Sequence, residues 1–371
     1  MTACGECLGR AWLLGRLAGH LDPVRRRIAC LLELDDEDLI AAVGGSRRTE
    51  LLGERRNFDP VAARTRCAVA GVTVVCRCDP AYPPALRDLA APPSVLHIGG
   101  SVERAQSLLA DQPVAIVGAR RPSPYGAEVA RSLARSLAGA AVTVVSGLAQ
   151  GIDAAAHEGA LDAWERTAAH EGALETRART MAVLPGGADR PYPASARRLQ
   201  RRIASDGVVI SELPPGTRVR RWMFPARSRI IAALSAMTVV VEARAGSGAL
   251  LTAGFAAELG RALGAVPGRI TSPLAEGPHE LLREGAQLVG GPQDVLDGLF
   301  GVGQRSAPVR TAAPLAPTLQ TLLDALADGS EISSALSRAG LGADRGLGAL
   351  AALELAGRIR REPGGRFSVL L

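Results

Sequence analysis

The segment 222–253 constrains the fold more than any other part of the sequence, because a predicted helix, a buried strand and a glycine turn follow one another directly. Apolar residues recur at the helical period over Ile230–Met237, and the β-branched run Thr238–Val241 is typical of a strand that a parallel sheet buries on both faces. The turn Gly246-Ser247-Gly248 then opens a predicted helix over Ala249–Leu263. Backbone N–H groups at such a helix start are well placed to bind a phosphate.

Strands alternate with helices over the surrounding sequence, from residue 113 onward. This order predicts an α/β fold with a parallel, doubly wound sheet that helices cover on both faces. Ligands of such sheets bind at the carboxyl ends of the strands, and four of the predicted strands are followed by loops that contain glycine. The predicted strands are Val114–Val117, Val142–Val145, Met181–Leu184, Val208–Ile210, Thr238–Val241 and Ala265–Val266.

The 371 residues are enough for two or three domains and the segments that connect them. Residues 1–70 are predicted to form a small helical domain, and residues 71–112 a connector into the main domain. The main α/β domain is predicted to span residues 113–300, and a linker containing proline and glycine follows over residues 301–317. Residues 318–371 are predicted to form three helices and a hairpin. That arrangement suggests a winged helix, which often binds DNA, although the arginines of the hairpin could equally form a solvated surface.

All 43 basic residues of the chain are arginine, and the formal net charge is +6. A guanidinium group can pair with two phosphate oxygens at once, so this composition favours phosphate-bearing partners. A GC-rich genome would also replace lysine by arginine, so the arginine content alone decides little. The sequence has no apolar run long enough to cross a membrane and no signal-type N-terminus, so we expect a cytoplasmic protein without a membrane partner.

The six cysteines all lie in the first quarter of the chain. The pairs Cys4-x-x-Cys7 and Cys76-x-Cys78 could be combined into a zinc site, but they are far apart in sequence and the second spacing is shorter than in the usual zinc knuckle. Free thiols in a reducing compartment are therefore the expectation, with no metal and no cofactor.

Candidate catalytic residues are few. Asp153 and His157 lie four residues apart on a predicted helix, where they could act as a base or bind a metal, but a capping aspartate and a packed histidine are the more usual roles. The loop Gly118-Ala119-Arg120-Arg121 is not a GxGxxG motif, so a dinucleotide cofactor is poorly supported. Pro185-Gly186-Gly187 resembles part of the PGGxGTxxE signature of the lysine-decarboxylase-like nucleotide phosphoribohydrolases. A nucleotide-binding enzyme of that type is therefore the alternative function.

A tandem duplication lies between the second and third predicted strands. The segment Ala155–Thr167 is followed directly by Ala168–Thr180, and the two copies are identical at 9 of 13 positions. Thirteen residues rotate a helix by roughly 220° beyond whole turns, so both copies cannot present the same face to the sheet. We expect the first copy to pack, with His157 partly buried, and the second to be looped out or to form an exposed helical extension that returns at Thr180.

Short motifs spread over residues 80–290 resemble the bacterial DNA-processing protein A family (DprA, also called Smf) in their order and spacing. The matching residues are Val117–Arg120, Tyr125-Gly126, Ser146–Asp153, Ala156-His157, Asp189, Tyr192-Pro193, Ile210–Glu212, Phe224–Ser235, Val241–Ala243, Ser247–Ala253 and Ala265–Gly268.

Three positions depart from the family pattern. Arg227-Ser228-Arg229 stands where the family usually has arginine-asparagine-arginine, Ala233 replaces a glycine and His279 replaces an asparagine. Serine keeps a hydroxyl but lacks the paired donor and acceptor of an amide.

The resemblance implies an extended Rossmann-like domain, a small SAM-like helical domain before it and a winged-helix domain after it. It also implies a protein that is not an enzyme. Members of the family are recombination mediators that bind single-stranded DNA, protect incoming DNA and help load the recombinase RecA during natural transformation. A homodimer is implied as well.

The resemblance and the glycine loops together predict how DNA would be bound. Arg120, Arg227 and Arg229 are expected to contact phosphates. Arg227 lies seven residues before Leu234, nearly in phase with the apolar helix face, so its guanidinium should point toward the sheet. Phe224 is expected either to stack on a base or to pack in the core. The backbone N–H groups expected to cradle the DNA belong to Gly118, Ser146, Gly147, Gly246, Ser247 and Gly248.

Overall fold

The computed structural model of the chain separates into two compact units, Met1–Ala307 and Pro308–Leu371. The division falls within the predicted linker at residues 301–317. The structure describes residues 3–171, 178–307, 315–355, 358–362 and 366–369.

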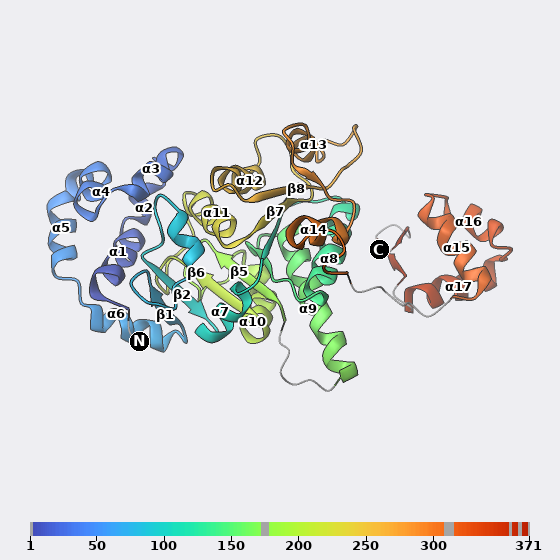
Figure 1. Cartoon of the computed structure of the whole chain (residues 1–371), viewed down its shortest axis with the longest axis horizontal. Coiled ribbons are helices and arrows are strands. Elements are labelled where there is room, and N and C mark those ends of the chain that lie inside the picture. The colour runs from blue at the N-terminus through green and yellow to red at the C-terminus, as the bar shows by residue number, and fades with distance from the viewer. Residues whose placement is uncertain (1–2, 172–177, 308–314, 356–357, 363–365, 370–371) are drawn as a thin grey trace. The chain divides into compact units, whose positions relative to one another are not determined.

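A nine-stranded sheet forms the core of the first unit (Figure 1). Its strands are β1 (Thr73–Cys76), β2 (Val95–Gly99), β3 (Val114–Val117), β4 (Val144–Ser146), β5 (Thr180–Leu184), β6 (Val208–Ser211), β7 (Met237–Val240), β8 (Ala262–Ala265) and β9 (Gln287–Leu288). They lie in the order β1-β2-β6-β5-β4-β3-β7-β8-β9. Strands β3 to β9 are parallel, whereas β2 is antiparallel to both β6 and β1. The predicted connector at residues 71–112 therefore adds two strands to the sheet.

The order of the strands reverses at β3. From β3 the chain steps through β4 and β5 to β6 on one side, and then continues through β7 and β8 to β9 on the other. Strands β3 and β7 are thus neighbours, with Val117 paired to Val240 at their carboxyl ends. The loops that follow them leave in opposite directions, which opens a crevice at this edge, as in other doubly wound sheets.

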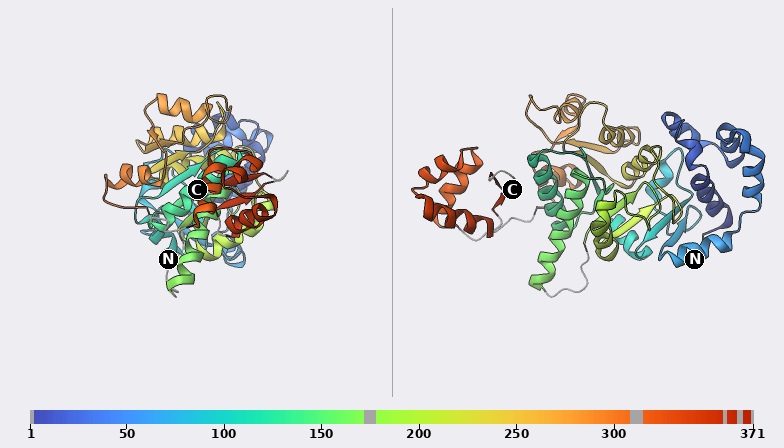
Figure 2. Two further views of the ribbon diagram at one scale, coloured as in Figure 1. Left: turned by 90° about the vertical axis from the view of Figure 1, so that its right-hand side faces the viewer. Right: turned by 180° about the vertical axis from the view of Figure 1, so that it is seen from behind.

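Helices cover both faces of the sheet, as Figures 1 and 2 show. Successive strand residues point to opposite faces, so Ala115 and Val117 pack on one side while Val114 and Ile116 pack on the other. The first face packs against α7 (Val102–Leu109), α11 (Met223–Leu234), α12 (Gly248–Glu258) and α13 (Glu276–Arg283). The second packs against α8 (Pro124–Gly139), α9 (Ile152–Glu171), α10 (Arg197–Asp206) and α14 (Pro292–Phe300). This is the predicted doubly wound α/β fold.

Six short helices precede the sheet among the described residues, and the first five share a hydrophobic cluster with the start of α11. They are α1 (Gly5–Arg16), α2 (Ala18–Leu21), α3 (Ile28–Glu33), α4 (Asp36–Val43), α5 (Arg48–Arg56) and α6 (Pro60–Val69). Trp222 is fully buried among their leucines, and its indole N–H donates to the carbonyl of Ala18 over 3.0 Å. The N-terminal helices therefore hold the beginning of α11 in place.

The helix that was predicted over Ala249–Leu263 is shorter than expected. It ends at Glu258, because Gly260 adopts a left-handed backbone conformation (φ +62°) that stops the helix. The residues after it form strand β8, three positions earlier than the strand predicted at Ala265–Val266.

Helix α9 carries the first copy of the duplication and continues into the second as far as Glu171. Its last turns project away from the rest of the unit, which is seen from behind in Figure 2. His157 is fully buried, more than the predicted partial burial, and its Nδ1 lies 2.7 Å from Oγ1 of Thr180, the first residue of β5. Residues 172–177 of the second copy lie outside the described part of the chain.

The second unit contains three helices and a two-stranded antiparallel sheet. The helices are α15 (Pro317–Ala327), α16 (Ile332–Arg338) and α17 (Ala343–Leu355), and the strands are β10 (Ile359–Arg361) and β11 (Phe367–Val369). They enclose a small core of their own around Leu322 and Leu353. The predicted turn at Pro363-Gly364-Gly365 lies outside the described residues. None of the helices in the described parts of either unit is both long and apolar enough to cross a membrane.

The duplication provides a matched pair of deletions. Removing residues 162–174 leaves one complete unit and keeps Leu161, Ala178 and Thr180, whereas removing residues 168–180 places Glu165 at the position of Ala178. Ala178 is fully buried, and burying an unpaired carboxylate there is costly. We expect the first deletion to fold with a Tm a few degrees below that of the full chain, since it removes the partly buried Trp164, and the second to melt clearly lower by circular dichroism. Failure of the first deletion to fold would contradict this account of α9.

Candidate nucleic-acid interface

A pocket of about 260 Å³ lies at the carboxyl ends of β3 and β7, where the strand order reverses. Its walls come from the loop after β3, the start of α9, the first turns of α11 and the start of α12. The lining residues are Val117, Gly118, Ala119, Arg120, Ala149, Asp153, Phe224, Pro225, Arg227, Ser228, Ile231, Ser247, Gly248, Ala249, Leu251 and Thr252. It brings together predicted site residues from three separate segments.

Arg227 lies at the bottom of this pocket. Helix α11 directs the side chain toward the sheet, as predicted from its phase with the apolar face, and only 8% of the residue is exposed. Its Nη1 donates to the carbonyl of Val183 at the end of β5 over 3.0 Å. The guanidinium lies directly over Gly147, where any side chain would overlap it. The absence of a side chain at Gly147 therefore makes room for the buried cation.

Asp153 supplies a negative charge near Arg227. Burial raises the pKa of the Asp153 carboxyl above its ordinary value, and the positive charge of Arg227 opposes that rise. Burial likewise lowers the pKa of Arg227, and Asp153 opposes that shift. Because an arginine guanidinium keeps its proton throughout the physiological range, the floor of the pocket stays charged.

Aromatic and cationic side chains stack on one another at the mouth of the pocket. The exposed Arg120 guanidinium lies 4.7 Å from the ring centroid of Phe224, and the Tyr192 ring centroid is 5.6 Å from that of Phe224. Phe224 is half-buried and Tyr192 is 40% exposed, so both rings keep a face that a planar group could contact. Tyr192 was not predicted as a site residue, although it lies in one of the motifs that resemble the family.

The start of α12 forms the remaining wall. Gly246 has a left-handed backbone conformation (φ +68°), and it turns the chain from β7 into the helix, which begins at Gly248. Ser247 precedes the helix, and its Oγ is buried with no hydrogen-bond partner among the described residues. The unpaired hydroxyl and the N–H groups of Gly248 and Ala249, the first two helical residues, are hydrogen-bond donors available to an anion.

Three of the predicted site residues are engaged within the protein. Ser146 is fully buried and donates its hydroxyl to the carbonyl of Ile116 over 2.6 Å, and Gly147 is buried beneath Arg227. Arg229 is 5% exposed, and its Nη2 donates to Oε1 of Glu212 over 2.6 Å. Because these residues are buried and bonded within the protein, they support the walls of the pocket and are poorly placed to contact a ligand.

Exposed arginines also lie in the other loops at the carboxyl edge of the sheet. Each of the loops that follow β3, β5, β6, β7 and β8 contributes at least one. In addition to Arg120 they are Arg121, Arg190, Arg218, Arg220, Arg221, Arg244 and Arg269. The ion pairs among the described residues involve none of them. The loops at the carboxyl edge therefore carry several arginines that no ion pair among the described residues neutralises.

The loop that resembles the phosphoribohydrolase signature is occupied by contacts with the segment that follows β6. A side chain at Gly186 would collide with Val219 and the carbonyl of Thr217, and the Gly187 N–H donates to that same carbonyl over 3.1 Å. The Asp189 carboxylate accepts from the N–H of Gly216 over 2.9 Å. This loop thus holds the segment after β6 and offers no support for nucleotide hydrolysis there.

A larger pocket, of about 520 Å³, lies at the opposite edge of the sheet. Its walls are mainly proline and aliphatic side chains from residues 80–85 and from α7, together with residues at the amino ends of the parallel strands, such as Pro113, Met181 and Ala236. It has no counterpart to the buried cation and helix start of the smaller pocket. We therefore place the candidate site at the carboxyl edge.

The model of the family described as DNA recombination-mediator protein A matches residues 73–300 of the chain. Protein Smf of Escherichia coli is 34% identical over 296 residues, which cover 76% of this chain and 74% of that protein. The chain belongs to the DNA-processing protein A family. The resemblance read from the sequence motifs is thereby confirmed.

Other members of the family match over different lengths. The putative DNA processing protein DprA of Mycobacterium tuberculosis is 44% identical over 196 residues, which are 53% of this chain but only 47% of that protein. The X-ray structure of DprA from Streptococcus pneumoniae has a TM-score of 0.62 and 31% identity, and the match covers 81% of this chain and 99% of the other.

A further relative is DNA processing protein A from Helicobacter pylori, whose solved structure concerns its unique single-stranded DNA binding mode. That structure has a TM-score of 0.52 and 29% identity, and it covers 62% of this chain and 95% of its own.

Substitution of Gly147 tests the packing of the pocket floor. Gly147→Ala would displace the Arg227 guanidinium from its bond to Val183, and we expect it to lower the free energy of unfolding by about 2–4 kcal/mol. Gly254→Ala is the matched control, because this exposed glycine inside α12 has open space around it, and alanine there should raise the free energy of unfolding by about 0.5–1 kcal/mol. Urea unfolding of both variants measures the difference. If Gly147→Ala unfolds with the same free energy as the unsubstituted chain, Arg227 is not fixed in this way.

Two buried histidines make stability depend on pH. Burial lowers the pKa of His157 to about 3 and that of His97 to about 4, from an ordinary value of 6.5. The unfolded chain takes up protons near pH 6.5 and the folded chain does not, so the stability present above that pH is lost as the pH falls toward 4. Each histidine contributes a slope of up to about 1.4 kcal/mol per pH unit.

Urea unfolding between about pH 7.5 and 5 measures this slope. His157→Gln should remove the contribution of that histidine to the slope, and His97→Gln should remove the contribution of the other. An unchanged slope in the His157 variant would contradict the buried, neutral state of that ring.

Proposed function

We propose that this protein is a recombination mediator that binds single-stranded DNA along the carboxyl edge of its sheet. The observation that carries the proposal is the pocket at the β3–β7 crevice, with a buried arginine at its floor and exposed arginines on the loops around it. Membership of a family described as DNA recombination mediators supports it, as does the related protein whose structure concerns single-stranded DNA binding.

The proposed contacts follow from the accessible groups of the site. Arg120 and the first residues of α12, Gly248 and Ala249, line the same pocket, so the guanidinium and the helix N–H groups would together hold a phosphate, with the Ser247 hydroxyl as a further donor. Arg227 would contribute its positive charge from the pocket floor. Phe224 and Tyr192 would stack on bases, which is possible only when the bases are not paired within a duplex. The exposed arginines would guide the rest of the strand by charge alone.

The same proposal includes no catalytic step. Asp153 and His157 are the buried polar residues at the start of α9, and each has a structural partner: Asp153 accepts weakly from the Ala149 N–H over 3.4 Å, and His157 contacts Thr180. These contacts support the packed roles over general acid–base chemistry.

The finer parts of the function come from the family. We propose that the protein acts in the cytoplasm as a homodimer, protects incoming DNA and helps load RecA during natural transformation. We also propose that the second unit is a winged helix, because its order of three helices and a two-stranded sheet fits one.

The proposal predicts a salt-dependent preference for single strands. In fluorescence anisotropy titrations we expect an oligonucleotide of mixed sequence to bind more tightly than its duplex. The logarithm of the association constant should fall with the logarithm of salt concentration, by about 0.7 for each phosphate neutralised. Arg120→Ala should weaken binding by roughly tenfold or more and reduce this slope, since it removes a charge-assisted contact worth about 1.5–3 kcal/mol.

Arg26→Ala is the matched control for that substitution, because Arg26 is also exposed but lies among the N-terminal helices. It should leave affinity and slope nearly unchanged. Equal losses in the two variants would point to a general charge effect, and binding that does not vary with salt would contradict the proposed contacts altogether.

A further inference from the structure

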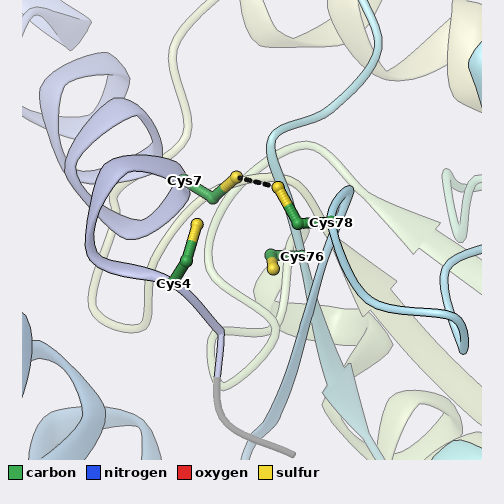
Figure 3. A group of neighbouring side chains, drawn as sticks. All are labelled: Cys4, Cys7, Cys76 and Cys78. Carbon is green, nitrogen blue, oxygen red and sulfur yellow. Dashed lines mark hydrogen bonds between the residues drawn. The ribbon is translucent and has the colours of Figure 1, made fainter.

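Four of the six cysteines come together beside the edge strand β1, although they belong to two segments far apart in sequence (Figure 3). Cys4 precedes α1 and Cys7 lies in the first turn of that helix. Cys76 ends β1, and Cys78 follows in the next turn. Their Sγ atoms all lie within 4.8 Å of one another, and those of Cys7 and Cys78 are 3.8 Å apart. The four side chains lie close together between α1 and the end of β1, as Figure 3 shows.

The separation between Cys7 and Cys78 matches one edge of a metal-binding tetrahedron, and the 4.8 Å limit on the other separations places all four sulfurs within about 1 Å of such an arrangement. In a zinc site with four thiolate ligands the Zn–S bonds are about 2.3 Å, so the sulfurs at the corners are about 3.8 Å apart. A disulfide would require about 2.05 Å between sulfurs. The separation between Cys7 and Cys78 is far too long for a disulfide and fits an edge of the tetrahedron. None of the six cysteines forms a disulfide in the structure.

We infer that Cys4, Cys7, Cys76 and Cys78 hold a structural zinc ion. Four protein ligands complete a tetrahedron and leave no position for water or substrate, which distinguishes a structural site from a catalytic one. The thiols would release their protons to solvent as the ion binds, because the thiolate is the ligand. The zinc keeps its oxidation state, so no oxidant or reductant takes part.

The local backbone explains how the short Cys-x-Cys spacing can serve two ligands. The chain turns immediately after β1, where the N–H of Asp79 donates to the carbonyl of Cys76 over 2.8 Å. The turn brings Cys78 back toward the side of the strand that faces α1. The expectation of free thiols rested on this spacing and on the distance in sequence, and it did not take account of a turn that folds the second pair around the same point.

The ion would connect the N-terminal helices to the sheet. The apolar cluster that joins them here is small, with Leu8 and Ala11 of α1 packed near Cys76 and Val95. Zinc would close a loop of about seventy residues, since Cys7 and Cys78 are 71 positions apart. Such a link limits the freedom of the unfolded chain and reinforces a thin interface. It would thereby also hold the helices that pack on Trp222 at the start of α11.

Metal content of the full-length protein tests this inference directly. The chain is purified without a histidine tag or chelator. Inductively coupled plasma mass spectrometry should then find about one zinc per molecule. Cys7→Ser and Cys76→Ser should lose the metal. Cys30→Ser and Cys67→Ser are the matched controls, one exposed and one buried, because neither cysteine belongs to the cluster, and both variants should keep it.

Two further measurements on the unmodified chain keep the test independent of whether the variants fold. Cobalt added to metal-free protein should give the visible absorption of a tetrahedral tetrathiolate site, and zinc should displace it. Removal of zinc by a chelator should lower the Tm by several degrees. Protein that contains no zinc and gives no such spectrum would overturn the inference, as would bound iron in place of zinc or a disulfide between Cys7 and Cys78.

Discussion

The buried guanidinium of Arg227 is the interaction on which the architecture of the site depends. A charge removed from water must be met by fixed polar groups, and here these are the carbonyl of Val183 and the nearby Asp153. To admit the cation, the loop after β4 must have glycine at position 147. Helix α11, the end of β5 and the start of α9 are thus brought to one point by a single side chain.

The accessible surface of the pocket follows from that arrangement. Phe224 lies one turn before Arg227 on α11, so fixing the arginine also fixes the ring at the mouth of the pocket. The ring in turn lies against both Arg120 and Tyr192, which come from the loops after β3 and β5. The groups proposed to stack on bases and to bind a phosphate are therefore positioned by elements of the rigid core, while the arginines of the surrounding loops are exposed.

Most of the sheet could be predicted from the sequence because its strands are short β-branched runs between glycine loops. Thr238–Val241 was placed within one residue of β7, and Arg227 pointed inward as its helical phase required. The end of α12 could not be predicted in the same way, because the apolar residues of β8 continue the composition of the helix and only the conformation of Gly260 separates the two.

Contacts between segments far apart in sequence could not be predicted from hydrophobic periodicity. Arg229 was predicted to be a site residue from the motif. Whether its side chain faces solvent depends on Glu212, which lies in the loop after another strand. The same holds for the four cysteines, which a turn after β1 gathers around one point. Tyr192 also gains its place in the site only through its contact with Phe224.

Photochemical crosslinking of a thymine-rich single strand, followed by peptide mapping, tests the central claim most directly, since it reports which aromatic side chains lie against bases. The account predicts crosslinks to the peptides that contain Phe224 and Tyr192, and their loss when unlabelled single strand competes. Crosslinks confined to the second unit, or to Tyr82 in the apolar pocket at the amino edge of the sheet, would contradict it.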